Sequence, residues 1–266
     1  MTRPSRSLLL AAVIAVAAPL TPAQAADLTA RQVTEELYAA SPSAPLDFSG
    51  RNLSGLDLAG LAFKQARLAK ANLFGADLTG ADLTGADLRA ANLDRVIAIG
   101  ARFDRANLAG ASLLRPTTTT SFEGNGRETP SFTGADLTGA HLFGVFSGGS
   151  FAGARMAGAT LAPFNETGFI EMLWRSRLDS ADLSAADLSG ANLRYVSLRF
   201  ANLKGANLTR ASLRNADLSH ADLTNADLSG ADLSLADLDG AKLAGARGLE
   251  SATGLDSTRN RDKTVN

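Results

Sequence analysis

The residues best suited to chemistry in this 266-residue sequence are aspartates that recur at a fixed spacing. Residues 76–88 contain Ala-Asp-Leu three times, each copy five residues after the last. A second run has the same step and consists of Asp217, Asp222, Asp227, Asp232 and Asp237. Carboxylates gathered at one place are ligands for calcium, and an acidic rod could also imitate the phosphates of DNA. The fold decides whether these aspartates are gathered or spread.

Other side chains give little indication of catalysis. The two histidines, His141 and His220, both fall at repeat positions that we expect to face solvent. The Gly-x-x-x-x-Gly spacings lack the Lys-Ser/Thr pair of a phosphate-binding loop, and no serine has the context of a nucleophile elbow. We therefore expect a non-enzymatic protein with no cofactor and with no catalytic, cofactor-binding or metal-binding residues.

Composition excludes several further classes. The chain has 26 basic and 27 acidic side chains, whereas a nucleic-acid binder usually has a basic surplus. No apolar stretch reaches the roughly 20 residues that a membrane helix needs. Cysteine is absent, so no disulfide can form. We expect no nucleic-acid partner and no stable membrane insertion.

The first 25 residues have the pattern of a signal peptide. Arg3 and Arg6 precede the apolar run of residues 8–20, and Ala23-Gln24-Ala25 follows with small residues at the cleavage positions. Cleavage near Ala25 predicts a periplasmic or secreted protein, whose mature chain keeps 24 basic and 27 acidic residues.

Large apolar residues also recur every five positions. They run from Phe48 to Leu113 and again from Leu178 to Leu243, with Ala98 as the one small centre. A small residue usually stands two positions before each centre, and Asp, Asn or Ser stands one before. Alternation in a strand puts the small and the large residue on one face and the polar residue on the other. Two turn-forming residues follow.

Four such sides would close a square coil of about 20 residues, stacked at about 4.8 Å per coil. One large and one small inward side chain per side would fill its narrow interior. The predicted structural core includes Leu78, Leu83, Leu88, Leu183, Leu188, Leu203 and Leu223.

In this geometry the aspartates are spread around the coil. Residues five apart lie on different sides, and residues 20 apart stack, so only Asp217 and Asp237 of the second run are neighbours. Other columns interleave Asp with Asn or with Arg, as Asp82 does with Arg102. Asn52, Asn72, Asn92 and Ser112 form a neutral column. Neither a calcium site nor a continuously acidic rod is favoured.

The A-(D/N)-L-x-x repeats over most of residues 47–245 resemble the pentapeptide-repeat family. The resemblance implies an all-β solenoid, a right-handed quadrilateral β-helix of pentapeptide repeats, here with a short N-terminal capping helix. Some members of that family resemble B-DNA and protect DNA gyrase from quinolones, usually as end-to-end dimers. A homodimer through an end cap is accordingly one expectation for this chain.

Both ends of the coil need covers. Thr29 and Gln32 form a capping-box pair, and Val33 and Leu37 share a helical face with Tyr38 beside it. Residues 26–46 are therefore predicted to be a capping helix and linker. From Arg247 the repeat is lost, and we expect residues 246–266 to form a C-terminal cap and a polar tail, loose from Ser257 on.

Two interruptions divide the repeats. Block 1 (47–113) and the irregular block 2 (132–161) are separated by a loop insertion at 114–131. A second loop insertion, at 162–177, precedes block 3 (178–245). Block 2 also has a one-residue slip between Leu142 and Phe146, expected to mark a kink or bulge. Loops on rigid scaffolds often carry function, so the candidate interaction residues are Arg115, Thr118, Glu123, Arg127, Glu128, Glu166, Glu171, Trp174 and Arg175. Plain decoration of the rod is the other interpretation, as is Trp174 covering a local defect.

Taken together, the sequence predicts a non-enzymatic exported β-helical scaffold that binds an unknown protein partner. Two alternatives stay open. One is a DNA mimic that protects a topoisomerase such as gyrase, and the other is a weak cation or glycan binder that uses the Asp/Asn columns.

Overall fold

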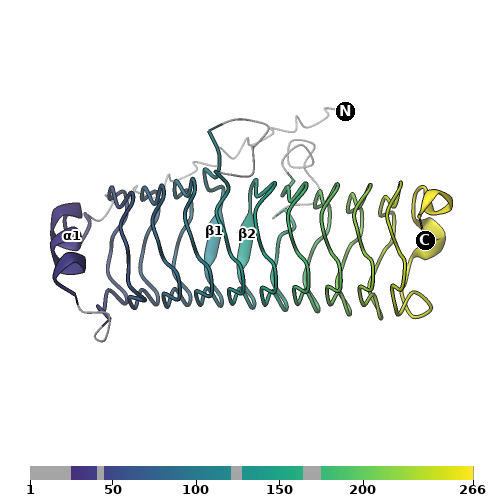
Figure 1. Ribbon diagram of the computed structural model, residues 1–266, viewed down its shortest axis with the longest axis horizontal. Coiled ribbons are helices and arrows are strands. Elements are labelled where there is room, and N and C mark those ends of the chain that lie inside the picture. The colour runs from purple at the N-terminus through teal and green to yellow at the C-terminus, as the bar shows by residue number, and fades with distance from the viewer. Residues whose placement is uncertain (1–24, 41–44, 121–127, 164–174, 266) are drawn as a thin grey trace, which may run out of the picture.

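The chain forms a rod of stacked coils, with the helix α1 (Ala30–Ala39) at one end and the C-terminus at the other (Figure 1). This computed structural model describes residues 25–40, 45–120, 128–163 and 175–265. The predicted signal peptide lies almost wholly outside the described residues. None of the helices within those ranges has the length and apolar character needed to cross a membrane.

Parallel bridges join the coils along four sides, mostly between residues 20 apart. Side A carries Asp47, Arg67, Asp87, Asn107, Asp136, Arg155, Asp187, Asn207, Asp227 and Arg247. Side B carries Asn52, Asn72, Asn92, Ser112, His141, Thr160, Asn192, Ser212, Asp232 and Thr253. Side C carries Asp57, Asp77, Ile97, Thr117, Val145, Arg177, Ser197, Asp217, Asp237 and Arg259. Side D carries Ala62, Asp82, Arg102, Ser131, Ser150, Asp182, Asn202, Asp222, Lys242 and Val265.

Most sides pair through a single bridge because the chain turns after about three extended residues. The exception is the pair of three-residue strands β1 (Ser112–Leu114) and β2 (His141–Phe143), which run parallel on side B. Each turn is named below by the two sides that it joins, for example the B–C corner.

The interior is packed with one large and one small side chain per side. The seven leucines of the predicted core are buried, and alanines such as Ala76 and Ala181 lie buried beside them. Rings fill the middle of the rod, where Phe132 stacks on Phe103 at 5.0 Å and on Phe151 at 4.9 Å between centroids. Stacked rings at this distance add to the burial of their apolar surface.

The outward Asp and Asn side chains have a structural task at the corners. The Oδ1 atom of Asp77 accepts a hydrogen bond from the Thr79 backbone N–H at 2.8 Å, and Asp227 accepts one from Ser229 at 3.0 Å. This side-chain turn satisfies an N–H that the short ladder leaves over. The next residue takes a positive φ, for which glycine is the least strained choice, as at Gly80 (φ 64°). The recurring Asp therefore forms the corner, and Asn forms it too, as Asn107 does by accepting from the Ala109 backbone N–H at 3.1 Å.

The structure corrects the start of the first insertion. Pro116 and Thr118 are buried at the small and large positions of one more side, in phase with Leu113, and Thr117 pairs with Ile97. The coil from Arg102 to Ser131 has 29 residues where the regular coil has 20. Nine residues are thus inserted at the C–D corner.

The second insertion ends earlier than predicted. Ser176 is buried at a small position, and Arg177 pairs with both Val145 and Ser197, so these two residues belong to side C. The coil from Thr160 to Asn192 has 32 residues, and its excess leaves from the B–C corner between Thr160 and Arg177.

The slip in block 2 shortens one corner by a residue. His141 pairs with Thr160, 19 residues on, and Val145 follows on side C only four residues after His141. Thr118 is 3% exposed, and its hydroxyl donates to the Val145 carbonyl at 2.5 Å. The Thr118 hydroxyl thereby donates to a carbonyl whose equivalents in the neighbouring coils accept from a backbone N–H.

The helix α1 (Ala30–Ala39) lies where the sequence predicts a helix, and its capping box of Thr29 and Gln32 is present. Val33 and Leu37 are buried in the hydrophobic core of the rod. Tyr38 was expected beside them but is 90% exposed, because it points away from the buried face.

At the other end the coil continues through the residues predicted to form a C-terminal cap and, from Ser257 on, a loose tail. Thr253, Arg259 and Val265 pair with Asp232, Asp237 and Lys242 at six-residue steps. Each longer step accommodates a wider turn, and the last two turns include the short 3-10 helices η2 (Leu255–Ser257) and η3 (Arg261–Lys263). The five-residue repeat ends as predicted, but the pairing does not.

Candidate interaction surface

Both insertions leave the rod at corners that bound side C. The first leaves after Thr120 at the C–D corner, and the second leaves before Arg175 at the B–C corner. Between these points lies a cavity of about 270 Å³, with a mostly apolar lining from residues 116–120, Val145 and Arg177. We call this region, made of the cavity and the bases of both insertions, the side C surface.

The structure places four of the nine predicted interaction residues. Arg115 lies on the B–C corner, and Arg175 is exposed at the base of the second insertion. Glu128 accepts hydrogen bonds from the Thr120 backbone N–H at 3.0 Å and hydroxyl at 2.6 Å, which ties together the two ends of the first insertion. Thr118 is 3% exposed and lies in the lining of the cavity. Glu123, Arg127, Glu166, Glu171 and Trp174 lie outside the described residues.

The B–C corner is a second candidate surface, because arginines and aromatic residues gather along it. From Ser54 to Leu235 its described residues include the arginines Arg95, Arg115, Arg175, Arg194 and Arg214, with Asp94 as the one acid. Phe74 is 42% exposed there, and the Arg95 guanidinium lies 5.7 Å from the centre of its ring. Tyr195 follows at the same corner, next to Arg194. Aromatic residues and arginine are enriched at protein interfaces.

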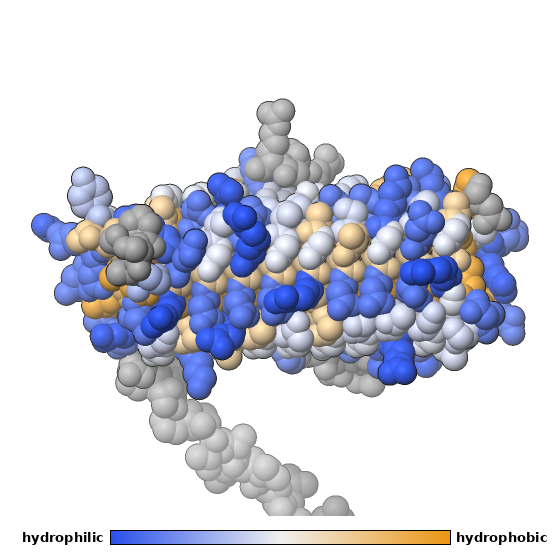
Figure 2. Space-filling model, turned by 60° about the horizontal axis from the view of Figure 1, so that its bottom comes forward, coloured by the Kyte–Doolittle hydropathy of each residue, from blue (hydrophilic) through white to orange (hydrophobic). Residues whose placement is uncertain are grey.

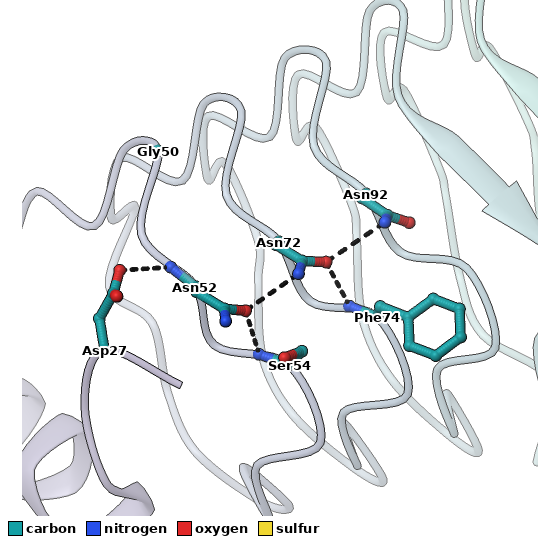
Figure 3. Close-up of a pocket in the computed structure, with 7 residues that line it drawn as sticks. All are labelled: Asp27, Gly50, Asn52, Ser54, Asn72, Phe74 and Asn92. Carbon is teal, nitrogen blue, oxygen red and sulfur yellow. Dashed lines mark hydrogen bonds between the residues drawn. The ribbon is translucent and has the colours of Figure 1, made fainter. Parts of the chain in front are cut away.

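Two grooves adjoin at Phe74. The amide groove, of about 510 Å³, has Asn52, Asn72 and Asn92 along its floor and is also lined by Asp27, Gly50, Ser54 and Phe74 (Figure 3). The arginine groove, of about 300 Å³, is lined by Phe74, Asp94, Arg95, Leu114, Arg115 and Phe143.

Hydrogen bonds along the rod fix the floor of the amide groove. The Asn72 amide donates to Asn52 Oδ1 at 2.9 Å, and the Asn92 amide donates to Asn72 Oδ1 at 3.2 Å (Figure 3). Asp27 ends the ladder, because its carboxylate accepts from the Asn52 backbone N–H at 2.7 Å. The three asparagines of the predicted neutral column therefore form a connected ladder, whereas the Ser112 hydroxyl donates to Asp94.

Ion pairs link successive coils over the rest of the surface. Asp82 lies 3.7 Å from Arg102, Asp136 lies 2.7 Å from Arg155, and Asp227 lies 3.6 Å from Arg247. Figure 2 shows hydrophilic residues in regular rows along one flank of the rod, with hydrophobic surface at its two ends. Exposed pairs of this kind contribute little to stability, typically about 0–1 kcal/mol each.

Several of the aspartates have a lowered pKa. Burial raises the pKa of Asp136, but hydrogen bonds from Thr138 and Arg155 outweigh burial and bring the pKa below its usual 3.8. Burial also raises the pKa of Asp222, but hydrogen bonds from Thr224 and Lys204 outweigh burial and lower that pKa. These carboxylates stay ionised at neutral pH and act as acceptors.

Neither histidine adjoins an arrangement suited to catalysis among the described residues. His141 is exposed on side B, and His220 stacks on Phe200 with ring centroids 4.9 Å apart. Within the described ranges no three His, Cys, Asp or Glu side chains come together as a metal site would require.

Sequence reasoning did not find the B–C corner. The signal was available, because corner residues of one side recur every 20 positions in a regular stretch, as Phe74, Asp94 and Leu114 do. The 20-residue count cannot be continued past an insertion, because the sequence does not show at which residue the coil resumes.

Comparison with protein families gives one match. The family described as pentapeptide repeats matches in 8 copies, over residues 52–89, 86–115, 173–210 and 216–247. Residues 116–172, which contain the first insertion, the slip and most of the second insertion, fall outside the match.

Several solved structures are similar to this chain. HetL, a pentapeptide repeat protein involved in heterocyst differentiation regulation from the cyanobacterium Nostoc sp. strain PCC 7120, is 28% identical, with 88% of this chain and 94% of that chain covered and a TM-score of 0.45. QnrB1, a plasmid-mediated fluoroquinolone resistance protein, is 18% identical, with coverages of 76% and 91% and a TM-score of 0.42. A pentapeptide repeat protein from the Arabidopsis thaliana thylakoid lumen is 28% identical, with coverages of 51% and 79% and a TM-score of 0.26. No curated protein sequence matches significantly.

Proposed function

Because this chain belongs to the pentapeptide-repeat family, whose fold is a right-handed β-helix, we propose that it is a non-enzymatic scaffold that binds a protein partner. The rod would hold the side C surface rigidly. The observation that carries this proposal is that both insertions leave at corners bounding one side, with an apolar-lined cavity between them.

Side C is energetically better suited to bind a partner than the regular flanks are. A flank of alternating acids and bases is well solvated, and its ion pairs contribute little. Desolvated apolar pockets with a few polar groups, by contrast, are where interface energy concentrates. Side C offers such a pocket beside Val145, with the exposed Arg177 at its edge.

The test is capture of a partner by the full chain and by variants in which each insertion is replaced by a short linker. We expect the partner to be lost when either insertion is removed while the melting temperature is kept. Capture that survives both replacements would place the binding surface elsewhere.

We further propose that the protein acts outside the cytoplasm. The support is the sequence pattern of residues 1–25, with its basic start, apolar run and Ala-Gln-Ala. Intact mass of the protein from a periplasmic extract should correspond to a chain that begins near Ala26. A chain that still begins at Met1 would refute export.

Topoisomerase protection is the alternative raised by the resemblance. It requires a rod that is acidic along its length, and ion pairs such as Asp82–Arg102 and Asp227–Arg247 interrupt that charge. Gyrase supercoiling should be unaffected by an excess of the mature protein. Inhibition or protection from quinolones at stoichiometric amounts would favour the alternative.

A homodimer through the C-terminal end is a secondary proposal. The last coil leaves Val265 50% exposed and Leu243, Leu249 and Leu255 only partly buried. Light scattering should give twice the chain mass, and Val265→Asp should return it to one.

A further inference from the structure

The amide groove and the arginine groove together form a surface distinct from side C, on side B and the B–C corner of the N-terminal half. They share Phe74, so one extended ligand can occupy both. The question is which chemistry such a ligand needs.

The amide ladder offers donors. Asn72 Oδ1 accepts from the Asn92 amide at 3.2 Å and from the Phe74 backbone N–H at 3.2 Å. A carboxamide has two acceptor sites and two N–H donors. Both acceptor sites of Asn72 are thus filled, and one N–H is used in the bond to Asn52, which leaves the second N–H for a ligand. The ligand should therefore be rich in oxygen acceptors.

The arginine groove selects for negative charge. Arg95 and Arg115 lie on successive coils, about 4.8 Å apart along the rod, and guanidinium groups bind carboxylates in a bidentate fashion. Asp94, beside Arg95, has partners of its own, because its Oδ1 accepts from the Ser112 hydroxyl at 2.5 Å and from the Leu114 backbone N–H at 3.0 Å.

The B–C corner carries large side chains on a backbone that favours glycine. The second corner residue has a positive φ, which glycine adopts without strain. From Arg95 to Leu235 the left-handed residues of the B–C corner are all larger than glycine: Arg95, Arg115, Tyr195, Asn215 and Leu235. Over the same stretch of the A–B corner this position is held by Gly110, Gly139, Gly158, Gly190 and Gly230, with Arg210 as the exception.

Phe74 supplies a flat apolar platform between the two grooves. Its ring is partly exposed, and its contact with Arg95 leaves ring surface open to the solvent. A sugar ring has an apolar C–H face that packs on such a platform, and hydroxyl and ring oxygens at its rim that accept hydrogen bonds.

We propose that side B and the B–C corner bind an extended acidic polysaccharide built of uronic acids. The amides of Asn72 and Asn92 donate to its hydroxyl and ring oxygens, Phe74 packs against a sugar face, and Arg95 and Arg115 bind successive carboxylates. This surface is separate from the insertions, so the inference stands or falls independently of the proposed function.

The experiment measures binding of fluorescent oligogalacturonate to the full chain by polarisation at low and at physiological salt. The test variant is Arg95→Gln with Arg115→Gln. Its matched control is Arg105→Gln with Arg210→Gln, which removes the same charge from other corners at residues with the same left-handed backbone, φ 56° at both. We expect saturable binding, an affinity loss of tenfold or more in the test variant, and a change within twofold in the control.

Two further arms separate the ligand class and the surface. Phe74→Ala should weaken binding severalfold, and polyglutamate of equal charge should bind at least tenfold more weakly than the oligosaccharide. Replacing both insertions by linkers should leave this binding unchanged. The proposal is overturned by absence of saturable binding, by equal losses in both arginine variants, by polyglutamate binding as tightly, or by dependence on the insertions.

Discussion

At the scale of single residues, the aspartate before each inward leucine acts as a hydrogen-bond acceptor for its own corner. The corner residue after it, in left-handed backbone, is the other local determinant. Ala185 (φ 54°) and Gly190 (φ 62°) occupy equivalent exposed positions at two corners of one coil. Gly190 has no atom within 4 Å of an added Cβ, so only backbone strain distinguishes the two sites.

This equivalence gives a paired prediction. Gly190→Ala should lower the free energy of unfolding by about 1 kcal/mol, because an L-residue is strained in the left-handed region. Ala185→Gly should be neutral or raise it by less, since glycine relieves strain but gains entropy when unfolded. Urea denaturation of both variants measures the difference. A higher free energy of unfolding for Gly190→Ala together with a lower one for Ala185→Gly would contradict the corner assignment.

Thr118 shows what an irregular residue does in a regular core. Its buried hydroxyl donates to Val145 across the coil that the slip has shortened. Thr118→Val keeps the shape but leaves the carbonyl unsatisfied, and should cost about 1–3 kcal/mol. Thr118→Ser keeps the donor and should cost less than Thr118→Val. Thermal unfolding measures both variants. If Thr118→Ser were less stable than Thr118→Val, the hydroxyl would not have this stabilising role.

Residue-level prediction from sequence succeeds where the repeat is strict. The burial of Leu83 or Leu203 follows from a five-residue phase and the need for a dry interior. It fails at Pro116 and Thr118, because a proline and a threonine stand where alanine and leucine were sought, although the phase from Leu113 still runs to them.

At the scale of elements, α1 is held on the rod by more than its two buried side chains. The Lys64 ammonium donates to the Leu37 carbonyl at 2.7 Å and to the Ala40 carbonyl at 3.1 Å, at the C-terminal end of the helix. These are carbonyls that a helix end leaves without internal partners, and a cation there also complements the helix dipole.

Lys64→Met should therefore loosen α1 without unfolding the coil. The loss should be about 1–2 kcal/mol, confined to the helix, because charge-assisted hydrogen bonds are the stronger kind. Hydrogen exchange should show faster exchange for the amides of residues 33–39 only. Lys70→Met is the control, since Lys70 has a similar left-handed backbone (φ 60°). Identical exchange in the two variants would contradict the contact.

The elements divide into those that sequence predicts and those that it does not. The capping helix follows from Thr29, Gln32 and the spacing of Val33 and Leu37. The C-terminal coil does not, because its step lengthens to six residues and its centres are no longer leucine. The sequence locates both insertions but misplaces one end of each. The reason is that Thr118 stands where leucine is expected and Ser176 stands where alanine is expected.

At the scale of the whole molecule, many weak corner interactions titrate together. Hydrogen bonds and nearby basic groups lower the pKa of Asp82, Asp87, Asp136, Asp222, Asp227 and Asp232 below 3.8. A carboxyl whose pKa is lower in the folded state stabilises that state above its unfolded pKa. The contribution is lost as the pH falls through the folded pKa.

The melting temperature should therefore be nearly constant from about pH 7 to pH 5 and fall steeply below about pH 4. Asp136→Asn combined with Asp222→Asn should flatten the acid limb, because a carboxamide accepts the same corner hydrogen bond without titrating. Calorimetry at several pH values tests this. A melting temperature that holds or rises down to about pH 2.5 would contradict the acceptor role of the aspartates.

The repeats direct folding, and the proposed partner binds on the side where the repeats break. A photo-crosslinking residue at Arg177 on side C or at Arg155 on side A compares the two most directly. Both arginines are exposed and paired with an aspartate, Arg177 with Asp179 at 3.0 Å and Arg155 with Asp136 at 2.7 Å. In the native compartment, the probe at position 177 should form one discrete adduct with a partner, and the probe at position 155 should form none. Equal adducts from both positions, or an adduct from position 155 alone, would contradict the claim.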